Sequence, residues 1–205
     1  MTTEKEIFPV VIGRFQPLHT GHQHLIESAH LMSKSGKFMI IIGSSDEPRT
    51  PKNPWTFEER KTMIEMWLAE RGITESKYVI KASHNYDSDL RWQEEIQQMI
   101  RESAPENTVI TIVGHDKDSS TKYFKTFPQY KFKDSGNLDA TIDATKIRQF
   151  IFEGQTQYIA GVVSKTTLTY ILGMKEVLNE LKNEYKDLVA YKKSWSHSPY
   201  PPAFI

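Results

Sequence analysis

The sequence predicts an α/β fold in which helices cover both faces of a parallel β-sheet. Short apolar runs rich in β-branched residues alternate along the chain with longer amphipathic segments. This alternation is typical of strands joined by helical crossovers, which make neighbouring strands parallel and bury both faces of the sheet. The length of 205 residues is that of one domain with at most a short appendage.

The apolar runs are predicted to be buried strands, and three of them lead directly into a glycine. They are residues 7–12, 38–42, 78–82 and 109–113. The amphipathic segments between them are predicted to be helices over residues 21–33, 56–71 and 88–103. Thr56 and Glu59 have the spacing of a capping box at the second helix start. Parallel sheets bind ligands at the carboxyl ends of their strands, so functional residues are expected just after each run.

The last third of the chain has a different pattern. It predicts a short helix over residues 147–152 and a long helix over residues 165–189 with leucines along one side. That leucine stripe would suit a homo-oligomer contact. Prolines in the tail exclude a helix from Ser194 onward, so residues 1–189 are expected to form the domain and residues 190–205 a linker or arm.

Charge and composition exclude several classes of protein. Lys and Arg number 26 and Asp and Glu number 26, so the formal net charge is zero. This balance lacks the global positive field of a nucleic-acid coat or a polybasic membrane binder, so neither partner is expected. The absence of cysteine excludes disulfides, zinc–thiolate sites and thiol catalysis. No apolar run approaches the ~18 residues of a transmembrane helix, and no signal peptide is apparent, so a cytoplasmic protein is expected.

The segment after the first predicted strand has the composition of an anion-binding site. Gly13 is followed by Arg14, and His19 and His22 flank Gly21 at the start of the next helix. The free N–H groups and the dipole of a helix start favour a phosphate, and an arginine fork and imidazoles add donors. The alternative is a structural turn in which the histidines only cap the helix. A strand, a loop and a helix start in this order favour phosphate binding.

The run GRFQPLHTGH resembles the signature of the HxGH nucleotidyltransferase superfamily. Its fuller form is similar to nicotinamide mononucleotide (NMN) adenylyltransferases of the archaeal type. It also resembles the adenylyltransferase domain of bifunctional NMN adenylyltransferase/Nudix hydrolases. The resemblance continues in residues 43–45, 53–60, 90–92, 113–116 and 145–148, and so covers most of residues 7–153. It implies a Rossmann-like parallel sheet flanked by helices, followed by a C-terminal helical segment.

The resemblance also implies roles for individual residues. Catalytic roles are implied for His19, His22, Arg14 and Arg148. ATP-binding roles are implied for Gly13, Arg14, Phe15, His19, Gly21, His22, Gly114, Asp116, Thr145 and Arg148. NMN-binding roles are implied for Trp92, Ser44, Asn53 and Arg49. No residue is assigned to a metal, because Mg²⁺ is expected to bind mainly through the phosphates of ATP.

Several of these residues also have a structural interpretation. Trp92 lies on an apolar helical stripe that suits the core, whereas the resemblance places its ring against the pyridinium of NMN. Arg49 could be a solvated loop charge, and Asp116 could be an N-cap. Asp143 and Ala144 replace the small polar residues of the family pattern, and Asp143 is expected to be an N-cap.

The function implied is adenylyl transfer from ATP to NMN, which gives NAD and pyrophosphate. Two alternatives stay open: an adenylyltransferase for another acceptor such as pantetheine phosphate, and a nucleotide-sensing module without activity. The sequence contains no Nudix box, P-loop or GxGxxG fingerprint. The proline-rich tail nevertheless resembles the linker that leads to a C-terminal Nudix domain in the bifunctional proteins.

Overall fold

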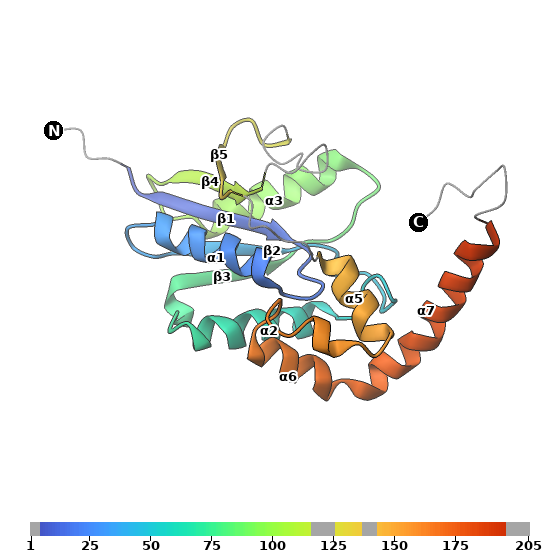
Figure 1. The fold of residues 1–205 in the computed structure, drawn as a ribbon. Coiled ribbons are helices and arrows are strands. Elements are labelled where there is room, and N and C mark those ends of the chain that lie inside the picture. The colour runs from blue at the N-terminus through green and yellow to red at the C-terminus, as the bar shows by residue number, and fades with distance from the viewer. Residues whose placement is uncertain (1–4, 116–125, 137–142, 196–205) are drawn as a thin grey trace.

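The computed structural model describes residues 5–115, 126–136 and 143–195 (Figure 1). Strands and helices alternate through most of the chain, as the sequence predicts, and helices alone form the C-terminal part. The strands are β1 (Ile7–Gly13), β2 (Phe38–Ile42), β3 (Tyr78–Ala82), β4 (Val109–Gly114) and β5 (Lys131–Asp134). The α-helices are α1 (Thr20–Met32), α2 (Phe57–Glu70), α3 (Asp89–Ser103), α5 (Ala144–Phe152), α6 (Lys165–Gly173) and α7 (Lys175–Trp195). Short 3₁₀ turns lie at Glu75–Lys77 and Thr156–Tyr158.

The strands form one parallel sheet in the order β3-β2-β1-β4-β5. The chain moves outward from β1 to β2 and β3, and then returns to the other side of β1 to form β4 and β5. The carboxyl end of β1 therefore lies at a topological switch point, where doubly wound sheets form their ligand-binding crevice. The parallel sheet confirms the predicted fold class.

Strand β5 was not predicted from the sequence. Its four residues have the sequence KFKD. The two lysines and the aspartate are exposed, and only Phe132 is partly buried. Polar residues are tolerated because β5 pairs only with β4 and forms an edge of the sheet. An edge strand of this kind lacks the apolar run on which the prediction of buried strands depends.

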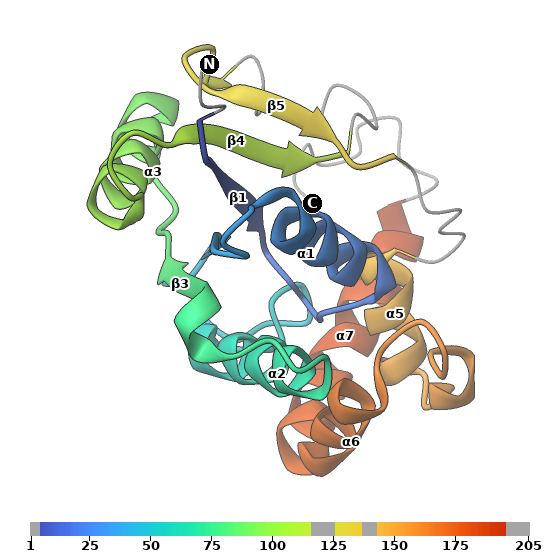
Figure 2. The same ribbon diagram turned by 90° about the vertical axis from the view of Figure 1, so that its left-hand side faces the viewer.

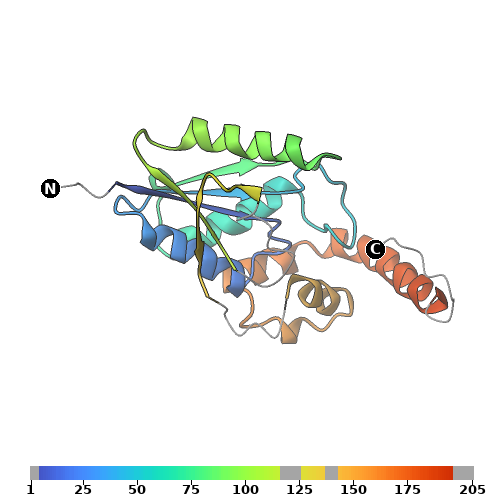
Figure 3. The ribbon, with the colours of Figure 1, turned by 90° about the horizontal axis from the view of Figure 1, so that it is seen from above.

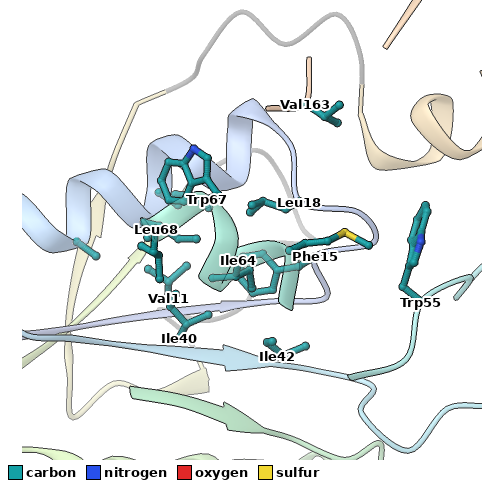
Figure 4. Close-up of a cluster of buried hydrophobic side chains, with 14 of the residues drawn as sticks. Val11, Phe15, Leu18, Ile40, Ile42, Trp55, Ile64, Trp67, Leu68 and Val163 are labelled. Carbon is teal, nitrogen blue, oxygen red and sulfur yellow. The ribbon is translucent and has the colours of Figure 1, made fainter. Parts of the chain in front are cut away.

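Each face of the sheet has its own apolar core. On one face, Val11, Ile40 and Ile42 pack under α1 and α2 together with residues of α5 and α6 (Figure 4). On the other, Val10 and Met39 pack with residues of α3. Figures 2 and 3 show α3 on the opposite side of the sheet from α1 and α2. The C-terminal helices α5 and α6 therefore pack on only one face of the sheet, the face covered by α1 and α2.

The long helix predicted over residues 165–189 is two helices. Helix α6 ends at Gly173, Met174 caps it with a non-helical ψ of 32°, and α7 begins at Lys175. Helix α7 then continues to Trp195, so the expected domain boundary at residue 189 falls inside a helix, and Ser194 and Trp195 are helical rather than extended. Residues 196–205 lie outside the described part of the chain. No helix in the described residues combines the length and apolarity needed to cross a membrane.

Candidate functional site

The candidate site lies where β1 ends and α1 begins. Gly13 closes the strand, and a loop that contains Arg14 and Phe15 leads to His19, the N-cap of α1. Phe15 is fully buried, and its ring lies 3.2 Å from the position that a Cβ on Gly13 would take. Packing of this ring therefore gives Gly13 a structural reason to be a glycine.

His19 and His22 lie together at the start of α1. Nδ1 of His19 accepts a hydrogen bond from the Gly21 amide at 3.1 Å, and the two imidazole rings are 3.9 Å apart between centroids. A Cβ on Gly21 would come within 3.0 Å of the His19 ring, so the cap requires a glycine there. The expected histidine pair is therefore present at a helix N-terminus, where backbone N–H groups and the helix dipole favour an anion.

The His22 side chain is half-buried, and its Nδ1 atom is enclosed without a hydrogen-bond partner among the described residues. Burial sets the pKa of His22 well below its ordinary value, and His19 lowers this pKa further, whereas a contact with the Pro17 carbonyl opposes the shift. The imidazole is therefore neutral at pH 7. A bound phosphate would favour its charged form, because an adjacent negative charge raises the pKa of a histidine.

Burial of neutral His22 should make the stability of the protein depend on pH. The pKa of His22 in the folded state is below 6.5, the ordinary value that the unfolded chain regains, so the unfolded state binds more protons as the pH falls. His22→Gln removes this titration. We expect wild-type stability, relative to the variant, to be constant above about pH 7 and to decline below about pH 6.5. Urea unfolding of both proteins across this pH range measures the difference. If the free energy of unfolding had the same pH dependence in both proteins, His22 would not be buried in its neutral form.

Arg60 joins the ends of two strands to α2. Its side chain is 1% exposed, and its guanidinium donates hydrogen bonds at 2.7 Å to the carbonyls of Arg14 and Gly43. It also donates to the carbonyls of Ser44 and Thr56, at 3.0 and 3.1 Å. Burial, and then the charge of Arg14, lower the pKa of Arg60 to about 10, so it stays charged at neutral pH.

Arg148 is a second buried cation at the site. Its guanidinium donates to the Gln16 carbonyl at 2.7 Å and to Thr145 Oγ1 at 3.3 Å, and 7% of the residue is exposed. Burial, and then the charge of Arg14, lower the pKa of Arg148 to about 10. Arg148 lies on α5, and Asp143 is the N-cap of this helix, as expected, because its side chain accepts a hydrogen bond from the Lys146 amide at 2.9 Å. The predicted pair Thr145 and Arg148 is thus joined to the loop after β1.

The charges at this site are unbalanced. Within the described residues, Arg14, Arg60 and Arg148 form no salt bridge with a carboxylate. Arg60 and Arg148 are buried and, in the part of the chain that the structure describes, bonded only to neutral groups. A buried charge without a paired counter-charge is costly, so an anion is the ligand that the arrangement favours. The described residues contain no cluster of three His, Asp, Glu or Cys side chains that could hold a metal.

Arg49 lies near the site but is paired. Its guanidinium contacts both carboxylate oxygens of Glu59, at 2.7 and 2.9 Å, and also donates to the Pro54 carbonyl at 2.7 Å. Hydrogen bonding with Glu59 raises the pKa of Arg49. The structure thus gives Arg49 a role in holding the loop before α2, and its expected contact with NMN stays a prediction.

The loops after β2 and β3 carry the other residues expected to bind NMN. Ser44 has a positive φ of 51° and donates to Asn85 Oδ1 at 3.1 Å. Asn53 is buried, and its Oδ1 has no partner among the described residues. Trp92, in the first turn of α3, is half-buried with its ring 5.5 Å from that of Phe127. It packs against the core and retains accessible surface, so both interpretations of this residue stand.

The end of β4 is joined to the end of β5 and to α1. The Gly114 carbonyl accepts from the Ser135 amide at 2.9 Å, and Ser135 Oγ lies 3.1 Å from His115 Nδ1. His24 Nε2 lies 2.9 Å from the Ser135 carbonyl oxygen. Asp116 lies outside the described residues. Gly114 therefore lies at the predicted edge of the sheet, next to two histidines.

Several residues that build the site were missed by the sequence analysis. Gln16 is buried and holds the backbone of Trp55 with two hydrogen bonds, at 2.7 and 3.1 Å. Figure 4 shows Trp55 at the end of the apolar cluster beyond Phe15. Arg60 and Ser135 were missed as well. Gln16 and Arg60 lie inside segments of the resemblance, but the local sequence gives none of the three residues a role, because each acts on backbone groups that are distant in the sequence.

Comparison with known proteins identifies the family. A model of the family described as cytidylyltransferase-like matches residues 10–153, which include the loop after β1 and Arg148. The chain belongs to the cytidylyltransferase-like family. This match covers β1 from Val10 onward, strands β2 to β5 and helices α1, α2, α3 and α5, so this cytidylyltransferase-like chain carries its candidate site within the matched region.

Named relatives of this cytidylyltransferase-like chain are adenylyltransferases. The chain is 28% identical over 181 residues to a nicotinamide/nicotinic acid mononucleotide adenylyltransferase from Acinetobacter baylyi, covering 86% of this chain and 92% of that protein. It is 28% identical over 166 residues to a nicotinamide-nucleotide adenylyltransferase from Thermococcus sibiricus, covering 81% and 83%.

A solved structure is also similar over almost the whole chain. It is a bifunctional NMN adenylyltransferase/ADP ribose pyrophosphatase from Francisella tularensis, with a TM-score of 0.84 and 33% identity. The match covers 97% of this chain, and the chain spans 59% of the length of that protein. The same enzyme has also been crystallised with AMP and a manganese ion.

Proposed function

We propose that this protein transfers the adenylyl group of ATP to NMN, giving NAD and pyrophosphate. The observation that carries the proposal is the group of cations at the switch point of the sheet, Arg14, Arg60 and Arg148, which form no salt bridge with a carboxylate among the described residues. A triphosphate supplies the missing negative charge. The names of the relatives from Acinetobacter and Thermococcus support this choice of reaction.

The reaction needs no covalent intermediate. A 5′-phosphate oxygen of NMN forms a bond to the α-phosphorus of ATP, and the bond from that phosphorus to the bridging oxygen of the leaving pyrophosphate breaks. The attacking phosphate is already anionic at pH 7, so a general base is unnecessary. Catalysis then depends on positioning and on stabilising charge at the α-phosphate and the leaving group.

The proposed ATP site is the loop after β1 together with the starts of α1 and α5. Its phosphates would contact Arg14, His19, the amide at Gly21, His22, Thr145 and Arg148. Arg60 would act indirectly, because four of its five N–H donors are used by the backbone of this loop, of the β2 end and of the α2 N-cap. The adenosine would lie by Gly13, Phe15, Gly114 and Asp116.

The proposed NMN site lies at the ends of β2 and β3. Trp92 would stack on the pyridinium ring, a contact that combines stacking with a cation–π attraction. Ser44 and Asn53 would line the same side, and Asn53 Oδ1 is a buried acceptor that lacks a donor among the described residues. Arg49 would support this side through Glu59.

A divalent ion, proposed to be Mg²⁺, would accompany ATP. The described residues around the phosphate site are cations and imidazoles, so they fit an ion held by phosphate oxygens and water rather than by a protein cage. When bound, such an ion would supply positive charge that neutralises part of the charge of the phosphates. The Francisella relative crystallised with AMP and manganese supports the use of a divalent metal.

A pyrophosphate-release assay tests the proposed function. ATP and Mg²⁺ are supplied with NMN, nicotinate mononucleotide or pantetheine phosphate, and the nucleotide product is identified by chromatography. Release with NMN and formation of NAD are the expected result. Release only with pantetheine phosphate would establish the other acceptor. Calorimetric binding of ATP without release under any condition would establish a nucleotide-sensing module instead.

Replacing Trp92 with alanine should distinguish its two interpretations. If its ring stacks on NMN, the variant should have a KM for NMN raised by about 10-fold or more and a nearly unchanged KM for ATP. Initial-rate kinetics with each substrate varied in turn provide the measurement. Tyr130→Ala is the control, because Tyr130 packs against the same core through Phe127. Equal increases in both KM values would assign Trp92 to the core alone.

A further inference from the structure

Glu95 lies on α3 three residues after Trp92, so the two side chains share one face of the helix. Its carboxylate receives bonds from the loop that precedes α3. It accepts from Ser83 Oγ at 2.8 Å and from the His84 amide at 3.1 Å, and it lies 2.6 Å from His84 Nδ1. The Tyr86 hydroxyl donates to it at 3.3 Å. One side chain therefore binds three residues of the loop.

Asn85, in the middle of this loop, extends the network to the loop after β2. Its amide donates to Asp46 Oδ1 at 2.9 Å, and its side chain accepts from Ser44 Oγ at 3.1 Å. Its Nδ2 donates to Glu47 Oε1. The loops after β2 and β3 are thus joined to each other and, through Glu95, to the helix that carries Trp92.

Ser83, at the start of the loop after β3, is held by backbone hydrogen bonds with Ile42 and Ser45, and side chains hold the loop beyond it. Residues 84–87 form no backbone–backbone hydrogen bond among the described residues. The Glu95 side chain is 15% exposed and that of His84 is 52% exposed, so the network lies at the rim of the sheet and not in the core. Loss of Glu95 would therefore free the loop while removing little apolar packing.

We propose that Glu95 is a positioning residue for the pyridine mononucleotide. It fixes the loops after β2 and β3 around the side of the site where Ser44 and Trp92 lie, so that the pocket for the acceptor is formed before NMN arrives. This role rests on the proposed function. It differs from a general contribution to stability because it concerns the acceptor side: the hydrogen bonds of Glu95 and Asn85 go to the loops after β2 and β3, whereas Arg14, His19 and His22 belong to the loop after β1 and the start of α1.

The test compares Glu95→Ala with Glu94→Ala, its exposed neighbour on the same helix. For Glu95→Ala we expect the KM for NMN to rise about 10-fold or more, with the KM for ATP and the melting temperature nearly unchanged. Glu95→Gln keeps one acceptor oxygen and should recover part of the lost affinity. Glu94→Ala should resemble the wild type in all three quantities.

The outcomes separate this role from the proposed function. A wild-type protein that forms no NAD would refute the function and the positioning role with it. An active wild type whose Glu95→Ala variant keeps its KM for NMN would refute the positioning role alone. Equal increases in the KM values for NMN and ATP, with a lower melting temperature, would also refute it, because they indicate a merely structural residue.

Discussion

Replacing His22 with alanine is expected to lower kcat for NAD formation by about 100-fold or more, the usual cost of losing one preorganised donor to a developing charge. His22 is held by the start of α1 and by the Phe15 ring, 4.7 Å away between centroids. Its donor would already be positioned when charge develops on the α-phosphate. A group that acts mainly in the transition state changes kcat and kcat/KM by similar factors. Steady-state kinetics with ATP and NMN measure both.

His30→Ala is the control for this prediction. His30 lies in the last turn of the same helix, where its ring contacts the Gly36 carbonyl, far along α1 from the phosphate site. We expect its kcat to stay close to that of the wild type. If His22→Ala retained wild-type turnover, phosphate stabilisation by this residue would be excluded.

Replacing Arg60 with methionine is expected to reduce the free energy of unfolding by about 3 kcal/mol or more. The carbonyls of Arg14, Gly43, Ser44 and Thr56 would lose a charged donor, at about 1–3 kcal/mol for each buried acceptor. Removing the buried charge offsets part of this loss, because burial lowers the pKa of Arg60 to about 10. The free-energy cost of the unpaired carbonyls is expected to be larger than the gain from removing the buried charge. Equilibrium unfolding in urea gives the difference.

Two further variants serve as controls for the prediction on Arg60. Lys61→Met changes the next residue, whose amine lies 3.9 Å from Glu65 in a surface pair, and should cost less than about 1 kcal/mol. Arg60→Lys keeps the charge but lacks the planar fork, and should fall between the wild type and Arg60→Met. Arg60→Met as stable as the wild type would show that water replaces the lost donors.

The order of the first four strands and of the helices between them was predictable from the sequence, as was the meeting of the histidine pair with the start of α1, where the phosphate site is proposed. Buried parallel strands leave runs such as residues 38–42, which are all buried in the structure, and capping residues such as Thr56 mark a helix start directly. The glycines and histidines after β1 are also a local pattern. Each of these signals acts within a few residues of the chain.

The rest of the site depends on contacts between distant residues. Arg60 was indistinguishable from a solvated helix charge, although its partners include the carbonyl of Arg14, 46 residues away. The sequence equally gave no sign that Arg49 would be neutralised by Glu59 ten residues later. The continuous leucine stripe concealed the break at Met174, because both helices place apolar residues toward the same core. Tertiary pairing, not local preference, decided these positions.

The two buried guanidiniums have a consequence for the balance between stability and function. Arg60 and Arg148 give up most of their hydration when the chain folds, before any nucleotide is present. In the proposed function, the phosphates of ATP would meet Arg148 directly and Arg60 only through the loop after β1. Neither cation would have to be stripped of water, which strengthens their attraction in a low-dielectric site. The folded protein carries the cost as reduced stability in the free state. Nucleotide binding should return part of it, so the free protein is the form most exposed to unfolding and proteolysis.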